Sequence, residues 1–529
     1  MIFENMKNFV QKIFLILLLL EISLSVIANN LKITNVSTTQ QNSIDNYCYV
    51  VFDVEWDNSW KDALNHDAIW VFIKYNDGNG VWNHANISTQ KNDHYIGIIN
   101  NVDPQMVPAT DKTGLFIERT ENGNGNIKWS QVSIRWNYGE NGVTDLSQVK
   151  LYVGAIEMVY ISEGSFKLGS GGSEQGSFTD GSWTSGASIP YIVNGEDPIE
   201  ISQVSGKLWG VSSTGEGRIG SEGTLEYLYP KGYNAFYCMK YEISQSMYGD
   251  FLNLLTRIQQ SNRWTITPGK WTSNFSVSNL PIERNGLKCY SDPGEPFPFI
   301  YVNDLNGNNI GNEITDGSDI PCPLTWADGF AFADWAGLRP MSELEYEKIC
   351  RGDQAPVPNE FAWGNASICT NNYLLNTNAG AYDVSITNLC SGANGNCTYD
   401  NAGSTSSVQR VGIFAGNSGN RVGAGATLYG VMEMTGNLLE RVITLSNDGL
   451  VDHGRKFDGS HGNGDLDNFG FANVPNWINE VGSEGVTFRG GSWKSPVNQL
   501  PVSYRSGFKS LGFPDRYSHY GFRCVRSKP

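Results

Sequence analysis

The chain has 529 residues, a formal net charge of -17 at pH 7, 59 glycines, 17% charged residues and 12% aromatic residues. This length exceeds what one hydrophobic core usually holds, so two or three domains are expected. The aromatic content argues against a disordered chain, and the scarcity of Lys and Arg argues against a nucleic-acid-binding surface. Few charges and many glycines are typical of a loop-rich globular protein.

Residues 1–28 have the pattern of a secretory signal peptide. Lys7 and Lys12 precede an unbroken apolar run at 13–20, and Ala28 is a small residue suited to cleavage. The apolar run is too short to span a membrane. We therefore expect a secreted, periplasmic or cell-surface protein whose mature chain has no membrane span.

Residues 29–152 predict a β-sandwich. Apolar residues stand at every second position from Cys48 to Trp56, which is the period of a half-buried strand. Residues 68–75 form an apolar run of strand length that ends at a Gly/Asn turn, and residues 132–138 alternate again. Short strands separated by turn signals favour a sandwich, and no catalytic pattern occurs in them.

Three short helices are expected in residues 153–529, within otherwise irregular chain. Ser244 can cap the first helix and Thr325 the second. Ser342 and Glu345 form a capping box for the third. Periodicity alone therefore predicts an α+β, loop-rich domain.

The chain has nine cysteines, so at least one thiol is left unpaired. Export makes disulfides possible. Cys390 and Cys397 bracket a Gly/Asn loop and are expected to close a small ring. No CxxC pair occurs, so zinc ribbons and thioredoxin-like chemistry lack support.

The order of motifs in this domain resembles the formylglycine-generating enzyme (sulfatase-modifying factor) family. The matching segments are EMVYISEGSFKLGS (157–170), FYCMKYEISQSMYGDFLN (236–253), PLTWADGFAFADWAGLRPMSELEYEKICRG (323–352), FAWGN (361–365), LYGVMEMTGNLLERV (428–442), FRGGSW (488–493) and GFRCVR (521–526). The resemblance implies an elaborated C-type-lectin-like fold at 153–529 with short helices and much irregular structure. The fold class is then α+β, with an N-terminal β-sandwich before that domain.

The cysteines that the family needs for catalysis are missing. In the family, two thiolates after GGSW bind Cu(I), and oxygen then converts a substrate cysteine within Cys-x-Pro-x-Arg into formylglycine. Here Ser495 stands where the first ligand is expected, and the second falls within 499–502, where no cysteine occurs. A serine hydroxyl does not replace a soft thiolate, so copper is not expected. Leu439 and Arg441 also stand where active-site aromatics are usual.

The resemblance implies two structural features as well. Cys350 and Cys524 stand where the family forms a disulfide between its second helix and its last strand. The family's calcium loop matches Glu433, Gly436, Leu438 and Glu440. Calcium binds oxygen ligands from side chains and backbone carbonyls, and this segment supplies both. The alternative is that Glu433 and Glu440 bind no metal and are carboxylates at a helix start or in solvent. A second calcium loop would fall near 376–383.

These patterns predict an exported, non-catalytic protein that acts in ligand binding or cell-envelope assembly. The segment 494–520 carries Tyr, Ser, Arg and Asn side chains, which make adaptable contacts with a protein or glycan partner. The alternative for its tyrosines, Tyr504, Tyr517 and Tyr520, is that they cover the core. The alternative function is that of a formylglycine-generating oxidase that acts on a sulfatase cysteine with copper and oxygen.

Overall fold

The computed structural model describes most of the chain after the expected signal peptide, which lies outside the described residues. The described residues are 30–184, 187–211, 219–272, 277–313, 315–376, 385–401, 407–416, 420–446, 454–478, 485–505 and 516–529. The expected second calcium loop (376–383) lies almost entirely outside them. Among the described residues, no helix is long and apolar enough to cross a membrane.

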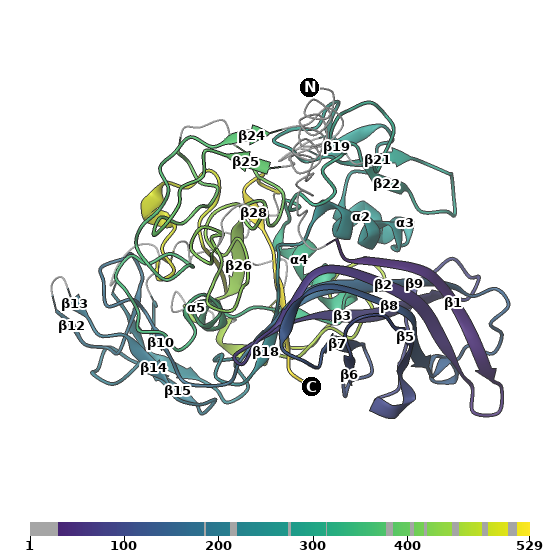
Figure 1. The fold of residues 1–529 in the computed structure, drawn as a ribbon, viewed down its shortest axis with the longest axis horizontal. Helices are drawn as coiled ribbons and strands as arrows, with labels where there is room; N and C mark the ends of the chain where they lie inside the picture. The colour runs from purple at the N-terminus through teal and green to yellow at the C-terminus, as the bar shows by residue number, and fades with distance from the viewer. Residues whose placement is uncertain are drawn as a thin grey trace, which may run out of the picture.

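Two antiparallel sheets, packed face to face, form the N-terminal part of the molecule (Figure 1). The first sheet has the order β1 (Lys32–Asn42), β2 (Tyr47–Lys61), β8 (Gly123–Trp136) and β5 (Tyr95–Ile99). The second has the order β23 (Arg339–Pro340), β29 (Cys524–Ser527), β18 (Phe236–Met239), β9 (Lys150–Ile161), β3 (Asp67–Asn76), β7 (Leu115–Arg119) and β6 (Pro104–Pro108), with β4 (Asn83–His84) paired to β3.

The predicted sandwich is confirmed, and its core follows from strand periodicity. Alternate residues of β2, from Cys48 to Trp56, are completely buried. They form one apolar cluster with Ile69, Val71 and Ile73 on the facing side of β3. Successive side chains of a strand point to opposite faces, so this pattern buries one face of β2 against the second sheet.

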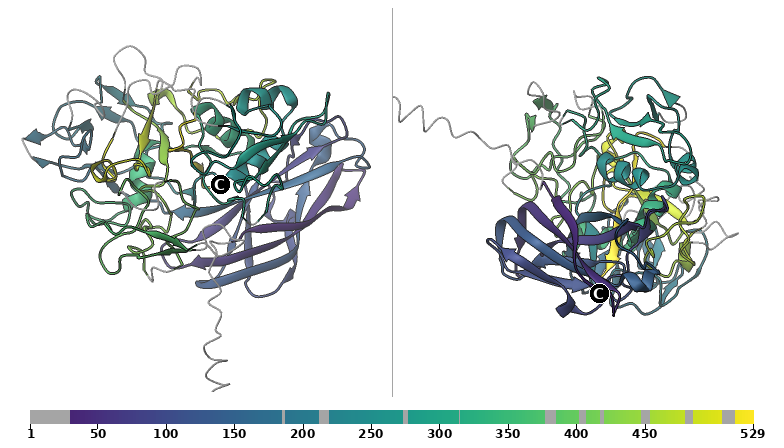
Figure 2. Two further views of the ribbon diagram at one scale, coloured as in Figure 1. Left: turned by 90° about the horizontal axis from the view of Figure 1, so that it is seen from above. Right: turned by 90° about the vertical axis from the view of Figure 1, so that its right-hand side faces the viewer.

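The second sheet runs without a break from the sandwich into the rest of the chain. Strand β9 pairs with β3 over ten residues, from Asp67↔Val159 to Asn76↔Lys150. The end of β9 pairs with β18, where Met158 lies opposite Met239. The boundary expected at residue 152 therefore falls inside β9. Figure 2 shows the sandwich (purple to blue) lying along one side of the molecule.

The predicted helices are confirmed, together with their caps. The four α-helices of the described chain are α2 (Gln245–Asn253), α3 (Arg257–Arg263), α4 (Trp326–Trp335) and α5 (Glu343–Arg351). Ser244 accepts a hydrogen bond from the backbone of Met247, and Thr325 and Ser342 form full capping boxes. Each cap satisfies backbone N–H groups that a helix start leaves unpaired. Strands and few helices make this an α+β fold.

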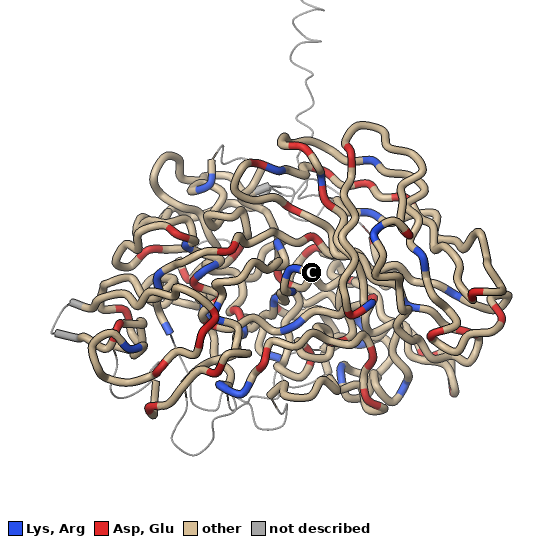
Figure 3. Tube along the Cα trace, turned by 90° about the horizontal axis from the view of Figure 1, so that it is seen from below, with Lys and Arg blue, Asp and Glu red and all other residues tan. Residues whose placement is uncertain are grey.

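The remaining elements are short, and irregular chain connects them. The short strands are β10 (Phe166–Leu168), β11 (Phe178–Thr179), β12 (Trp183–Thr184), β13 (Ala187–Ser188), β14 (Tyr191–Val193), β15 (Ile199–Ile201), β16 (Trp209–Gly210), β17 (Gly223–Leu225), β19 (Lys270–Thr272), β20 (Val277–Ser278), β21 (Leu287–Ser291), β22 (Ile300–Asn303), β24 (Leu374–Asn376), β25 (Ser385–Thr387), β26 (Leu439–Ile443), β27 (Val486–Arg489) and β28 (Tyr520–Gly521). The 3-10 helices are η1 (Lys91–Asp93), η2 (Tyr138–Asn141), η3 (Gly454–Lys456) and η4 (Val497–Gln499). Figure 3 shows basic positions interspersed with acidic ones along the chain.

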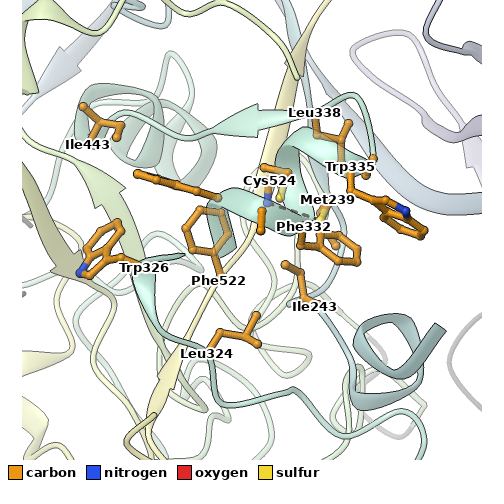
Figure 4. Packing of buried hydrophobic residues seen from close by; sticks show 14 of the residues in the cluster. Met239, Ile243, Leu324, Trp326, Phe332, Trp335, Leu338, Ile443, Phe522 and Cys524 are labelled. Carbon is orange, nitrogen blue, oxygen red and sulfur yellow. Dashed lines mark hydrogen bonds between the residues drawn. The ribbon is translucent and has the colours of Figure 1, made fainter. Parts of the chain in front are cut away.

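Helix α4 lies at the centre of the largest apolar cluster. Its Trp326, Phe332 and Trp335 pack with Met239 of β18 and Phe522, which precedes β29 (Figure 4). This contact ties the helix to the last strand of the chain. The closing block of the sequence is therefore part of the core.

The disulfide expected between Cys390 and Cys397 is wrong. Cys390 is bonded to Cys369, with the two Cα atoms 5.5 Å apart. Cys369 and Cys390 share a small cluster around Tyr373, whereas Cys397 is a buried thiol in a neighbouring cluster with Trp363. The packing of these clusters therefore places Cys369, which is further away in the sequence than Cys397, next to Cys390.

The disulfide expected between Cys350 and Cys524 does not form either, and both residues are buried thiols. Cys524 points to the α4 face of the sheet, where its backbone N–H contacts the sulfur of Met239. Cys350 lies on the opposite face with Cys238 and Val525. Because neighbouring residues of a strand point to opposite faces, the sheet itself separates the two thiols.

Candidate functional site

A tight turn follows β27 at the position where the sequence places the first missing cysteine. Gly490 and Gly491 have positive φ angles of 82° and 68°. The Ser495 hydroxyl accepts a 3.0 Å hydrogen bond from the Ser492 backbone N–H, and the two serine hydroxyl oxygens lie 3.2 Å apart. Ser495 is only 5% exposed. Its hydroxyl therefore closes the turn.

The second expected ligand position holds apolar residues. Leu500 and Val502 are buried. Leu500 packs closely against the turn, because a Cβ atom added at Gly491 would lie only 2.3 Å from Leu500 Cδ2. The Val502 backbone N–H donates to the Glu360 carbonyl at 2.8 Å. Two hydroxyls and aliphatic side chains do not provide the soft donors that Cu(I) needs, so these residues do not fit copper.

Arg441 of β26 fills a cage of aromatic rings beside this turn. Its guanidinium carbon lies 4.8 Å from the ring centre of Trp326, 4.9 Å from Phe488 and 5.1 Å from Tyr520. One Nη donates to the Leu324 carbonyl at 2.9 Å, but Nε and the other Nη have no hydrogen-bond partner. The side chain is completely buried. Burial lowers the pKa of Arg441 to about 9.

The segment expected to hold calcium forms a buried acidic cluster around Arg523. Glu440 Oε1 accepts a 2.8 Å bond from Arg523 Nε, and Glu433 Oε1 accepts one from the backbone of Gly412 at 2.8 Å. The Leu438 backbone N–H donates to Glu242, and Gly436 adopts a φ of 83°. The Arg523 guanidinium also donates to three backbone carbonyls, those of Met239, Lys240 and Met432.

In this arrangement Arg523, an internal cation, neutralises Glu440. Calcium takes about six to eight oxygens, but Arg523 already binds Glu440 and the three carbonyls. The second carboxyl oxygens of Glu433 and Glu440 are buried without a hydrogen-bond partner, and burial raises the pKa of Glu433 to about 7. No group of three or more His, Cys, Asp or Glu in the described chain is placed to hold a metal ion. Calcium binding stays a prediction for elemental analysis.

The described parts of the 494–520 segment are engaged mainly with the protein itself. Arg505 is buried and donates to Glu343 at 2.7 Å, and Arg516 pairs with Asp328 at 2.8 Å. Tyr517 and Tyr520 stack edge to face at 5.1 Å and remain partly accessible. Residues 506–515 lie outside the described chain.

The comparisons with known proteins agree with the order of these motifs. A family model described as the sulfatase-modifying factor enzyme 1-like domain matches residues 228–528, more than half of the chain. The chain belongs to this family. A search of curated proteins found none that matches the sequence. The family resemblance of the sequence motifs is thereby confirmed.

The match places every candidate residue above inside the sulfatase-modifying factor domain. The first sheet and the strands β3, β4, β6, β7 and β9 of the second sheet lie before residue 228, outside the matched part, whereas β18, β23 and β29 lie within it. The sequence showed that Leu439 and Arg441 depart from the usual pattern, but not that Arg441 is buried among three rings. That arrangement joins α4, β26, β27 and β28, which are distant in the sequence.

Proposed function

We propose that this sulfatase-modifying factor protein is exported and non-catalytic, and that it acts in ligand binding or cell-envelope assembly. The observation that carries the proposal is the Ser492–Ser495 turn, in which the hydroxyl that replaces the first thiolate is buried and hydrogen-bonded. A hydroxyl in this setting is neither a soft ligand nor a free nucleophile. Arg441 supports the proposal, because its cation fills the neighbouring aromatic cage.

Export is supported by the sequence pattern of residues 1–28 and by the Cys369–Cys390 disulfide, since disulfides persist in oxidising compartments. The mass of the mature protein from the exported fraction tests this part. We expect a chain that begins shortly after Ala28. A full-length chain retained in the cytosol would contradict export.

The catalytic assay uses the full mature chain, Cu(I), oxygen and a peptide that contains Cys-x-Pro-x-Arg. We expect no copper-dependent formation of formylglycine and no stoichiometric copper after dialysis. A family enzyme that retains both cysteines is the positive control, and the peptide with Cys replaced by Ser is the negative control. Copper-dependent turnover by this chain would overturn the non-catalytic proposal and favour the oxidase.

The 494–520 segment is our proposed contact surface for a protein or glycan. Tyr517 and Tyr520 are its partly accessible aromatic residues. Once a ligand is in hand, Tyr517→Ala is expected to weaken binding at least tenfold, whereas Tyr290→Ala, at an exposed tyrosine on β21, leaves it unchanged. Equal affinities of the two variants for the ligand would show that the contact surface lies elsewhere on the protein.

A further inference from the structure

The outer edge of β5 (Tyr95–Ile99) is an open strand edge with apolar side chains in solvent. Strand β5 is the last strand of the first sheet, labelled in Figure 1, and within the described chain it pairs with β8 alone. Its Tyr95, Ile98 and Ile99 are 40%, 45% and 43% exposed. A strand with one unpaired edge can add a strand from another chain.

The neighbouring edges of the sandwich carry features that hinder such pairing. Strand β1, at the other edge of the same sheet, pairs irregularly with β2, and its Asn35 and Gln40 have positive φ angles of 57° and 52°. Strand β6, at the edge of the facing sheet, begins with Pro104 and ends with Pro108. Bulges and prolines protect an edge from another strand. Strand β5 has no proline and no charged residue, and its register with β8 is unbroken.

The sequence of β5, YIGII, is complementary to itself when it is reversed. In an antiparallel pair of two copies centred on Gly97, Tyr95 lies opposite the partner's Ile99, and Ile96 lies opposite the partner's Ile98. Aromatic and β-branched side chains that face each other across two strands stabilise the pair. Gly97 meets the partner's Gly97 at the centre, where neither copy has a side chain to collide. The strand is therefore matched to a second copy of itself.

The two kinds of cross-strand pair lie on opposite faces of the sheet, because successive side chains of a strand alternate. The ring of Tyr95 lies 5.3 Å from that of Tyr49, on the face of β2 that points away from the core. The pairs of Tyr95 with Ile99 therefore extend this outer face. Ile96 packs against the sandwich core, so the pairs of Ile96 with Ile98 extend the cover of that core.

The charges that flank β5 are also complementary in this arrangement. Asp93 is paired with Arg135 at 3.2 Å, whereas Lys91 before the strand and Asp103 after it are exposed. Antiparallel pairing brings the Lys91 end of one copy to the Asp103 end of its partner. Opposite charges then flank the paired strands and offset part of the repulsion between two chains that each have a net charge of -17.

We propose that two copies of this chain pair through β5, antiparallel and centred on Gly97, and so join their two four-stranded sheets into one continuous sheet. A five-residue edge buries little area, so the dimer is transient, with a dissociation constant on the order of 10 to 100 μM. The surface goes beyond the proposed function, because it involves neither the Ser492–Ser495 turn nor the 494–520 segment. The outcome of the copper assay therefore does not bear on it.

The test is sedimentation velocity of the full mature chain over a range of concentrations, with paired charge variants. Tyr95→Lys/Ile99→Lys places lysine opposite lysine in both outer pairs, and Tyr95→Glu/Ile99→Glu places glutamate opposite glutamate. Each variant alone is expected to dimerise at least tenfold more weakly than the wild type, because like charges opposite each other destabilise a strand pair. An equimolar mixture of the two variants is expected to regain the dimer, because each pair then joins opposite charges.

The matched control is Val36→Lys/Thr38→Lys, which makes the same change in charge at exposed positions of β1. It is expected to dimerise as the wild type does, and circular dichroism melting shows whether each variant is folded. A wild type that stays monomeric up to about 0.5 mM, at least fivefold above the expected constant, overturns the proposal and leaves the edge to a strand of another protein. A dimer that persists in both charge variants overturns β5 as the contact. A mixture that stays monomeric overturns the pairing centred on Gly97.

Discussion

Arg441 shows how one side chain alters the chemistry of the domain. A guanidinium buried among three rings gains cation–π attraction, yet two of its three nitrogens have no hydrogen-bond partner. Burial without a carboxylate partner disfavours the charge, which is why the pKa falls to about 9. At neutral pH Arg441 fills the space between the rings, and the desolvation of its guanidinium costs free energy.

We therefore predict that Arg441→Met is tolerated better than Arg441→Ala. Methionine keeps most of the volume and removes an unpaired charge, so we expect stability within about 1 kcal/mol of the wild type. Alanine leaves a cavity between the rings and is expected to cost about 2–4 kcal/mol. Urea unfolding at pH 7 measures both. Equal losses for the two variants would show that the guanidinium itself stabilises the cage.

Asp67 of β3 is a second buried charge, at the joint between the sandwich and the matched domain. Its Oδ1 accepts hydrogen bonds from Ser59 Oγ at 3.1 Å and from the Trp60 backbone at 2.8 Å. Its Oδ2 lies 3.7 Å from Lys240 Nζ, which Glu157 also approaches, at 3.6 Å. Burial, opposed by Lys240 and reinforced by Glu157, raises the pKa of Asp67 to about 7.

This raised pKa predicts the direction of the pH dependence. A carboxyl group with a raised folded-state pKa contributes stability that is fully present below its unfolded pKa, 3.8 for Asp67, and lost as the pH rises through about 7. A shift of about three units corresponds to at most about 4 kcal/mol. Asp67→Asn is expected to flatten the fall in unfolding free energy between pH 4 and pH 8.

Denaturant unfolding at several pH values checks this, with Asp77→Asn, an exposed position at the end of the same sheet, as the control. The control is expected to follow the wild-type pH profile. An unchanged profile for Asp67→Asn would assign the pH dependence to other buried carboxyl groups, of which Asp334 also has its pKa raised by burial, to about 6.

At the scale of elements, the side of β18 and β29 to which each cysteine points determines which other thiols it can reach. Cys238 and Val525 point to the α5 face, whereas Met239 and Cys524 point to the α4 face. Burial raises the pKa of Cys350 to about 12. These thiols are therefore poor nucleophiles within the folded protein.

Peptide mapping of the purified protein under non-reducing conditions is expected to show the Cys369–Cys390 pair. Cys350, Cys397 and Cys524 should be alkylated as free thiols only after denaturation, because they are buried. Since the disulfide spans 21 residues, Cys369→Ala is expected to cost about 3 kcal/mol. Recovery of a Cys390–Cys397 or Cys350–Cys524 peptide would contradict this prediction.

Local sequence patterns predicted the helices and strands well, but they predicted less well which residues of different elements contact one another. The alternation in β2 and the caps at Ser244, Thr325 and Ser342 are local, and all are confirmed. The partner of Cys390 depends on which small cluster each cysteine joins, and spacing along the chain does not reveal that. The burial of Arg441 likewise depends on segments that meet only in the fold.

At the scale of the whole molecule, the sandwich and the sulfatase-modifying factor domain share one sheet. Strand β9 pairs with β3 over ten residues on one side and with β18, which lies in the matched domain, on the other. We expect the full chain to unfold in one calorimetric transition. A chain that starts at residue 153 is expected to aggregate, because it exposes the remaining edge of β9. Two well-separated transitions, or a soluble folded truncation, would show that the parts are independent.

The position of β29 also constrains when the molecule can be completed. This strand consists of residues 524–527, and it lies inside the sheet between β18 and β23. Until these residues have been synthesised, β18 has an open edge and the cluster around α4 lacks Phe522 and Cys524. The complete sheet therefore cannot form until residues 524–527 have been synthesised. This order agrees with the export that we propose, because a chain whose second sheet is still open can be threaded across a membrane.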